Sequence, residues 1–239
     1  MQPEVKKKQS PWLYIGIGCG SLLLIGAIIV GVGVWFVAKK ANEIKEDMAN
    51  PIVRTEKVKK ALGAKTLPDG YYAMMSLSVP MVMDTAMIST KDPDAPHDGG
   101  ASVFMYFFLK SATSRDVGNL RDYLEGKSDD ASVISRAGLD TEGNEVLGRG
   151  VLEYDGRRLL YLTQRGELRG NNSDRERGPT LNTLVFFECP GSSNVRMGVW
   201  LEPDPSPETP TSELDLQGTT VDPEAVRPFM AHFNPCQES

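Results

Sequence analysis

The sequence predicts an α+β fold in which a single amino-terminal transmembrane helix precedes a mostly antiparallel β-sheet domain with flanking helices. Residues 12–38 carry no charged side chain, which indicates a membrane span. Later in the chain, strand-like runs are joined by hairpin turns, and helical patterns gather before and after the hairpins. The 239 residues, 40% of them hydrophobic, suffice for one packed domain plus attachments.

Charge is distributed unevenly along the chain. Residues 1–65 hold 11 Lys and Arg against 5 Asp and Glu, a net of +6, whereas residues 66–239 hold 15 against 27, a net of −12. A basic amino-terminal part joined to an acidic body indicates two environments. The overall net charge of −6 argues against a dedicated nucleic-acid-binding protein, and a total of 3 cysteines excludes a disulfide-dense miniprotein.

Residues 1–11 form a short basic tail, and residues 12–38 form the predicted transmembrane helix. A helix crosses the hydrocarbon core of a bilayer with about 20 apolar residues, and this stretch is longer. Trp12 and Tyr14 stand at one end and Trp35 near the other, where aromatic rings favour the headgroup region. The lipid bilayer is therefore the first expected partner.

A cleaved signal peptide is the alternative interpretation of this stretch. The apolar run of a signal peptide is about 7–15 residues long, and the run here is far longer. Residues 38–41 also lack a small-x-small cleavage site. The basic residues after the span favour a cytoplasmic body, whereas a short basic tail before a first helix commonly stays in the cytoplasm. We expect a cytoplasmic tail and an extracytoplasmic body.

Small residues form a stripe along one side of the predicted span. Gly16, Gly20, Ala27 and Gly31 share one face of a helix that turns about 100° per residue. A smooth stripe lets a second helix approach closely, which predicts a homodimer through the transmembrane helix. Glycine is also frequent in membrane helices in general, so the stripe has an alternative explanation without self-association.

A charged, helix-favouring segment over residues 39–65 follows the span. Asn50 is placed to cap a helix that begins at Pro51 and ends at Gly63. Lysines surround the few apolar residues of this helix. We expect a solvated stalk, and the alternative is a basic collar that touches anionic lipid.

The globular body is assigned to residues 66–239, and its first half is predicted to form three strands and a helix. Runs rich in Tyr, Val, Met, Ile and Thr predict strands over 71–79 and 81–90. The nearly continuous apolar run 101–110 predicts a central buried strand, and apolar residues at helical spacing predict a short helix over 114–126.

Two hairpins and a last helix are predicted for the second half of the body. Hairpins are expected over 145–164, with Asp155-Gly156 at the turn, and over 180–202. The Pro-rich, acidic stretch 203–221 is expected to be a surface loop, and the last helix opens at Asp222. The helices are expected to cover one face of the sheet.

The sequence contains no motif of a known catalytic, metal-binding or phosphate-binding site. His97 and His232 stand apart from any metal-binding pattern, and the cysteines form no Cys-x-x-Cys. A phosphate-binding glycine loop and a nucleophile elbow are both lacking. We therefore predict no cofactor, metal site or catalytic residue. The alternative is an envelope-bound enzyme whose carboxylates act in a pocket that the sequence does not reveal.

Two further groups of residues could bind a metal ion, but each is better explained by a structural role. Asp92, Asp94, His97 and Asp98 share one loop and could hold calcium, but two prolines break the spacing of an EF-hand, so a solvated loop is favoured. Methionines within residues 74–87 could bind Cu(I) but are better explained as core residues of strands.

Arginines cluster on and after the first hairpin. Arg157, Arg158, Arg165 and Arg169 are predicted as a patch for an anionic partner, because guanidinium groups suit phosphate and carboxylate. Acidic residues are interleaved with them, so internal pairing is the alternative, and it is favoured.

Cys189 and Cys236 are the natural disulfide pair of an exported body, since Cys19 lies in the predicted span. Two free thiols in a reducing compartment are the alternative. The sequence thus predicts a single-pass anchored protein whose non-catalytic α+β domain binds or senses a ligand or a protein at the cell envelope.

Overall fold

A computed structural model describes residues 49–79, 82–95, 100–110, 114–136, 143–166, 179–192 and 194–236. All of these except Ala49 belong to one compact unit, which begins at Asn50. The predicted span over 12–38, with its small-residue stripe, lies outside the described residues. Among the helices of the described ranges, none is both long enough and apolar enough to cross a membrane.

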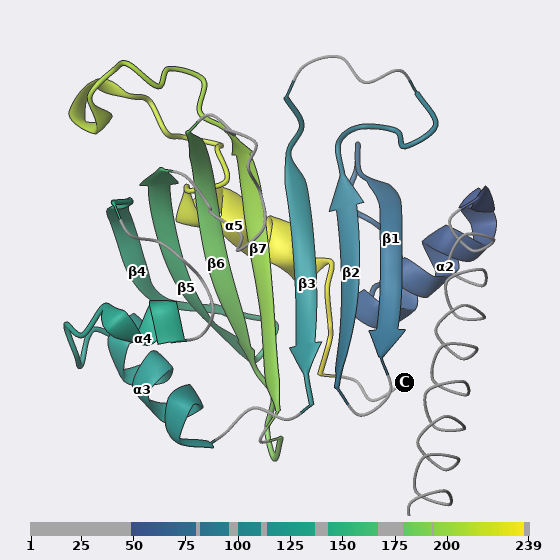
Figure 1. The fold of residues 1–239 in the computed structure, drawn as a ribbon, viewed down its shortest axis with the longest axis horizontal. Helices are drawn as coiled ribbons and strands as arrows, with labels where there is room; N and C mark the ends of the chain where they lie inside the picture. The colour runs from purple at the N-terminus through teal and green to yellow at the C-terminus, as the bar shows by residue number, and fades with distance from the viewer. Residues whose placement is uncertain are drawn as a thin grey trace, which may run out of the picture. The chain divides into compact units, whose positions relative to one another are not determined.

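In the described part of the chain, seven antiparallel strands form one sheet in the order β1-β2-β3-β7-β6-β5-β4 (Figure 1). The strands are β1 (Tyr72–Val79), β2 (Met83–Ser89), β3 (Val103–Leu109), β4 (Glu145–Tyr154), β5 (Arg157–Gly166), β6 (Thr180–Glu188) and β7 (Val195–Pro203). The helices are α2 (Pro51–Leu62), α3 (Ser114–Leu124), α4 (Ser132–Arg136) and α5 (Pro223–Ala231), with a 3-10 turn, η1, over Thr211–Glu213. The α+β class that the sequence predicts is confirmed.

Helices lie on both faces of the sheet (Figure 1). Val58 of α2 and Met230 of α5 pack with Phe104 of β3 in one core, whereas Leu124 of α3 and Leu184 of β6 belong to a second core on the other side. The expectation that helices cover one face only is therefore wrong. Both faces are covered because β6 is buried along almost its whole length and therefore needs helices on either side.

The helix α2 begins and ends as the sequence predicts. The Asn50 side chain accepts hydrogen bonds from the backbone N–H of Ile52 and Val53, at 3.1 and 3.3 Å. Gly63 ends the helix with a φ of 61°. Val58 and Leu62 are 0% and 1% exposed, so α2 belongs to the core of the domain, although the sequence assigned these residues to the stalk.

The turn between β4 and β5 and the start of α5 also follow local sequence. Asp155 and Gly156 take φ values of 48° and 70°, as the tight turn between β4 and β5 requires. Asp222 caps α5 by accepting a hydrogen bond from the backbone N–H of Glu224 at 3.0 Å. The five-residue helix α4 and the turn η1 are not predicted by the sequence, because elements this short show no periodicity.

Candidate functional site

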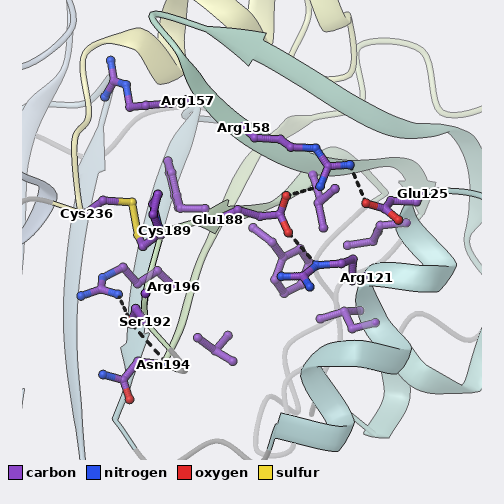
Figure 2. Close-up of a pocket in the computed structure, with 18 of the residues that line it drawn as sticks. Arg121, Glu125, Arg157, Arg158, Glu188, Cys189, Ser192, Asn194, Arg196 and Cys236 are labelled. Atoms are coloured by element: carbon purple, nitrogen blue, oxygen red, sulfur yellow. Dashed lines mark hydrogen bonds and ion pairs between the residues drawn. A yellow bond between two sulfur atoms is a disulfide. The ribbon is translucent and has the colours of Figure 1, made fainter.

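A groove of about 1000 Å³ opens at the end of the sheet where β5 begins and β6 ends, beside the last turn of α3 (Figure 2). Apolar side chains from α3 and three strands form part of its lining: Leu120, Leu124, Leu160, Phe186 and Val195. A volume of this order reaches the upper end of the range for small-molecule sites. The groove can therefore accept a sizeable ligand with apolar surface.

A chain of ion pairs runs along the groove (Figure 2). The Nε atom of Arg121 lies 2.6 Å from Glu188 Oε1, and Arg158 also pairs with Glu188. Arg158 Nη2 lies 2.5 Å from Glu125 Oε1, and Lys127 pairs with Glu125 as well. Hydrogen bonds from Lys127 and Arg158 lower the pKa of the Glu125 carboxyl. Glu125 in turn raises the pKa of Arg158.

The cations of this ion-pair chain are more exposed than its anions. The side chains of Arg121 and Arg158 are 48% and 40% exposed, whereas those of Glu188 and Glu125 are 17% and 7% exposed. The carboxylates therefore lie beneath the guanidinium groups and hold them in place. Because a guanidinium has five N–H donors in a fixed plane, donors remain for an incoming anion.

The groove is positive within an acidic body. Among the described residues, five cationic ones line it, namely Arg121, Lys127, Arg157, Arg158 and Arg196, against three anionic ones, namely Glu125, Asp155 and Glu188, a net of +2. Residues 66–239 have a net charge of −12. A local positive surface in a negative protein attracts anions to that place rather than to the domain as a whole.

A disulfide between Cys189 and Cys236 forms one wall of the groove. The two Cα atoms lie 5.2 Å apart, and the bond joins the end of β6 to the segment after α5. The disulfide that the sequence predicts is thus present. Arg157 reinforces this connection, because its guanidinium donates to the backbone oxygen of Phe233 at 2.5 Å. The wall of the groove is therefore tied to the sheet at two points.

Arg196 of β7 lines the groove. Its guanidinium stacks on the ring of Phe108, 4.1 Å from the ring centre, and donates to Ser192 Oγ at 3.0 Å. The residue is only 6% exposed, and its Nε atom has no hydrogen-bond partner among the described residues. Tyr106 lies on the same sheet face as Arg196, and burial raises the pKa of the Tyr106 hydroxyl. Arg196 thus supplies fixed positive charge rather than a mobile contact.

The structure divides the four predicted arginines. Arg157 and Arg158 line the groove. Arg165 lies at the opposite end of β5, where its Nε atom is 2.6 Å from a carboxylate oxygen of Asp204. Its other guanidinium nitrogens donate to two backbone oxygens of the loop before η1 and to the hydroxyl of Thr211, the first residue of η1. Arg169 lies outside the described residues. Arg165 therefore has a structural contact, and the anionic patch as a set of four stays a prediction.

Sequence reasoning missed five charged residues of the groove: Arg121, Glu125, Lys127, Glu188 and Arg196. Arg121 and Glu125 are spaced at i and i+4, which places them on one side of α3 and its end and is the only local signal. Glu188 precedes the turn at Cys189, and Arg196 is isolated in β7. Their proximity comes from strand pairing and helix packing, which no local pattern reports.

The loop with Asp92 and Asp94 has a structural explanation. Asp94 pairs with Arg54 of α2 at 3.0 Å, and a side-chain oxygen of Asp92 accepts a hydrogen bond from the backbone N–H of Asp94. His97 and Asp98 lie outside the described residues. Within the described part of the chain, no three or more His, Cys, Asp or Glu side chains come together in a group that could hold a metal ion.

No family model, curated protein or solved structure matches this chain. The fold and the geometry of the groove are therefore the basis for inferring function.

Proposed function

We propose that this chain is a single-pass membrane-anchored protein whose α+β domain faces the extracytoplasmic side and binds an anionic ligand in the groove. The proposal rests on one observation: along the ion-pair chain, the cationic side chains are more exposed than the carboxylates that pair with them. The guanidinium groups of Arg121 and Arg158 reach solvent, while the carboxylates that hold them lie beneath. Such an arrangement presents preorganised donors to an anion.

The membrane anchor is supported by the uncharged residues 12–38, which are long enough to span a bilayer. The extracytoplasmic orientation is supported by the disulfide between Cys189 and Cys236, since disulfides persist in oxidising compartments. Recovery of the full-length chain in the soluble fraction, after lysis without detergent, would contradict the anchor.

The chemistry of the groove favours a ligand with both negative charge and apolar surface. Arginines form planar, bidentate contacts with carboxylate or phosphate groups. Pro190, which is exposed, and Val195, which is half-buried, line the same groove and gain by covering an apolar part of the ligand. An acidic peptide with interspersed apolar residues satisfies both requirements.

Binding is favoured over carboxylate-based catalysis by the state of the acidic residues. A general acid needs a carboxyl group with a raised pKa. In the groove, Lys127 and Arg158 lower the pKa of Glu125. Burial raises the pKa of Glu202, but this residue accepts a hydrogen bond from the backbone N–H of Thr220 and does not line the groove.

The proposal is tested by peptide binding to the full chain in detergent micelles. A fluorescein-labelled peptide of alternating Glu and Leu is titrated, and its anisotropy is recorded. Replacement Arg121→Gln removes one exposed charge-assisted contact of about 1 kcal/mol, so the dissociation constant should rise about fivefold. Binding to wild type should also weaken with added salt.

Arg227→Gln is the matched control, because the Arg227 side chain on α5 is 45% exposed and pairs with an acidic neighbour, as Arg121 does. It should leave peptide affinity unchanged, and a peptide of alternating Gln and Leu should bind neither protein. Equal affinity of the acidic peptide for the Arg121 and Arg227 variants would contradict the groove as the binding site.

A further inference from the structure

We infer that Met74, Met75 and Met87 form a binding site for the monovalent copper ion, Cu(I). These three residues, called the methionine triad, lie in the paired strands β1 and β2. None of them lines the groove, so the site is separate from the one proposed for the anionic ligand. It also does not depend on the membrane anchor.

A bulge in β1 places all three side chains of the triad on one face of the sheet. Ala73 pairs with Ile88 and Met75 pairs with Met87, so β1 has one extra residue here, which is Met74. Ala73 and Ile88 are buried in the core under α2 and α5. Because side chains alternate along a strand, Met74 and Met87 point away from that core, and Met75 shares the face of its partner Met87.

The triad is half-buried and belongs to neither core of the described domain. In Figure 1, α3 and α4 lie over the other end of the sheet, and no described helix lies in front of β1 or β2 on this face. The sequence favoured a core role for the methionines within residues 74–87, and for these three the packing does not support it. Core packing therefore leaves the grouping of three methionines on this face unexplained.

The spacing of the triad suits three ligands of one ion. Directly opposed residues of an antiparallel pair have Cβ atoms about 4.5–5.5 Å apart, and Met74 and Met75 are neighbours in the chain. A methionine side chain is unbranched and rotates about three bonds, so the three sulfur atoms can turn toward one point above the strand pair. Met105 lies beside Met87 on β3 but packs against the second core, so it borders the triad.

The chemistry of the triad selects Cu(I) over other metal ions. Thioether sulfur is a soft, neutral ligand that suits Cu(I), whereas Mg²⁺, Ca²⁺ and Mn²⁺ take carboxylate and carbonyl oxygens. On the described strands β1, β2 and β3, no residue of this face is charged, so a hard cation finds no carboxylate there. The net charge of −12 over residues 66–239 favours the approach of a cation to the domain.

The inference is tested by Cu(I) binding to the full chain in detergent micelles. All proteins carry Cys19→Ser, which removes the one cysteine outside the disulfide. Ascorbate keeps the copper reduced, and the chelator bicinchoninate competes for it, so that the absorbance of its copper complex reports the ion that the protein leaves free. Loss of an outer-shell partner alone weakens metal binding by about 10–100-fold, so Met87→Leu, which removes a ligand, should raise the dissociation constant about 100-fold.

Met83→Leu is the matched control, because Met83 is half-buried on the same face of β2 but pairs with Val79, away from the triad. It should leave the affinity for Cu(I) unchanged, whereas Met74→Leu and Met75→Leu should each weaken it. Leucine conserves the volume of methionine, and retention of the disulfide verifies that each variant folds. Equal affinities of the Met87 and Met83 variants, or no Cu(I) binding by the starting protein, would overturn the inference.

X-ray absorption at the copper edge identifies the ligands directly. With the triad as the site, the first coordination shell of the bound ion contains sulfur only. Nitrogen in that shell would assign the ion to a histidine and overturn the inference.

The copper site and the ligand groove are tested separately. Met87→Leu should not alter binding of the acidic peptide, and Arg121→Gln should not alter binding of Cu(I), because the groove contains no residue of the triad. Failure of copper binding and failure of the proposed ligand site are therefore separate results.

Discussion

The disulfide between Cys189 and Cys236 should contribute a large part of the stability of this domain. The bond closes a loop with a sequence separation of 47 residues. In the chain-entropy model, a loop of this length destabilises the unfolded state by about 4 kcal/mol, which is an upper figure. The segment that it holds also contains the Asn234 N–H, which donates to the backbone oxygen of Leu62 at 3.1 Å.

The perturbation is the double replacement Cys189→Ser with Cys236→Ser in the full chain. For a domain of this size, each kcal/mol lowers the melting temperature by about 2–4 °C, so a loss of about 4 kcal/mol predicts a decrease of roughly 8–16 °C. The assay is thermal unfolding followed by near-ultraviolet circular dichroism in detergent micelles. A reducing agent should move the wild-type transition in the same direction.

Cys19→Ser is the control, and it should leave the transition unchanged. A decrease below about 2 °C for the double variant would refute the loop-entropy reasoning. In a second measurement, protein taken directly from cells into acid is alkylated with and without reduction. Free thiols at both Cys189 and Cys236 would contradict the exported orientation.

Two further predictions concern buried charge. Arg165→Met leaves the carboxylate of Asp204, whose side chain is 0% exposed, without its cation, and should cost about 3–5 kcal/mol in urea unfolding. A loss below about 1 kcal/mol would contradict a structural role for this pair. Burial raises the pKa of Glu202 above its ordinary value of 4.5, so the folded state prefers the protonated form and stability falls as the pH rises through the raised pKa. Glu202→Gln, which keeps an oxygen for the Thr220 N–H, should therefore raise the melting temperature at pH 7.5 and change it little at pH 4, and an equal change at both pH values would contradict this assignment.

Local elements of the fold were predictable because their causes are local. The cap at Asn50 and the turn at Asp155-Gly156 depend on a few neighbouring residues, and both occur where the sequence places them. The cysteine pair was predictable by elimination, since Cys19 lies in the predicted span. The anchor itself stays a prediction that rests on the apolar stretch 12–38.

The pairing of distant strands was not predictable in the same way. The pairing of β3 with β7 joins the two halves of the sheet across a long sequence separation. Many registers satisfy the same alternation of apolar residues, and only the packing of the whole domain selects one. This pairing also determines which strands α3 covers and which it leaves open.

In the groove as well, some residues were predictable from local patterns, whereas their proximity depended on contacts between distant segments. Local patterns show that Arg157 and Arg158 follow a turn, and that Arg121 and Glu125 are spaced at i and i+4 along α3 and its end. The contact of Arg121 and Arg158 with Glu188 at the end of β6 arises only when α3 packs against the sheet. Turn and helix signals act over a few residues, whereas a binding site is assembled by contacts between segments far apart in the chain, whose energies depend on every other element being in place.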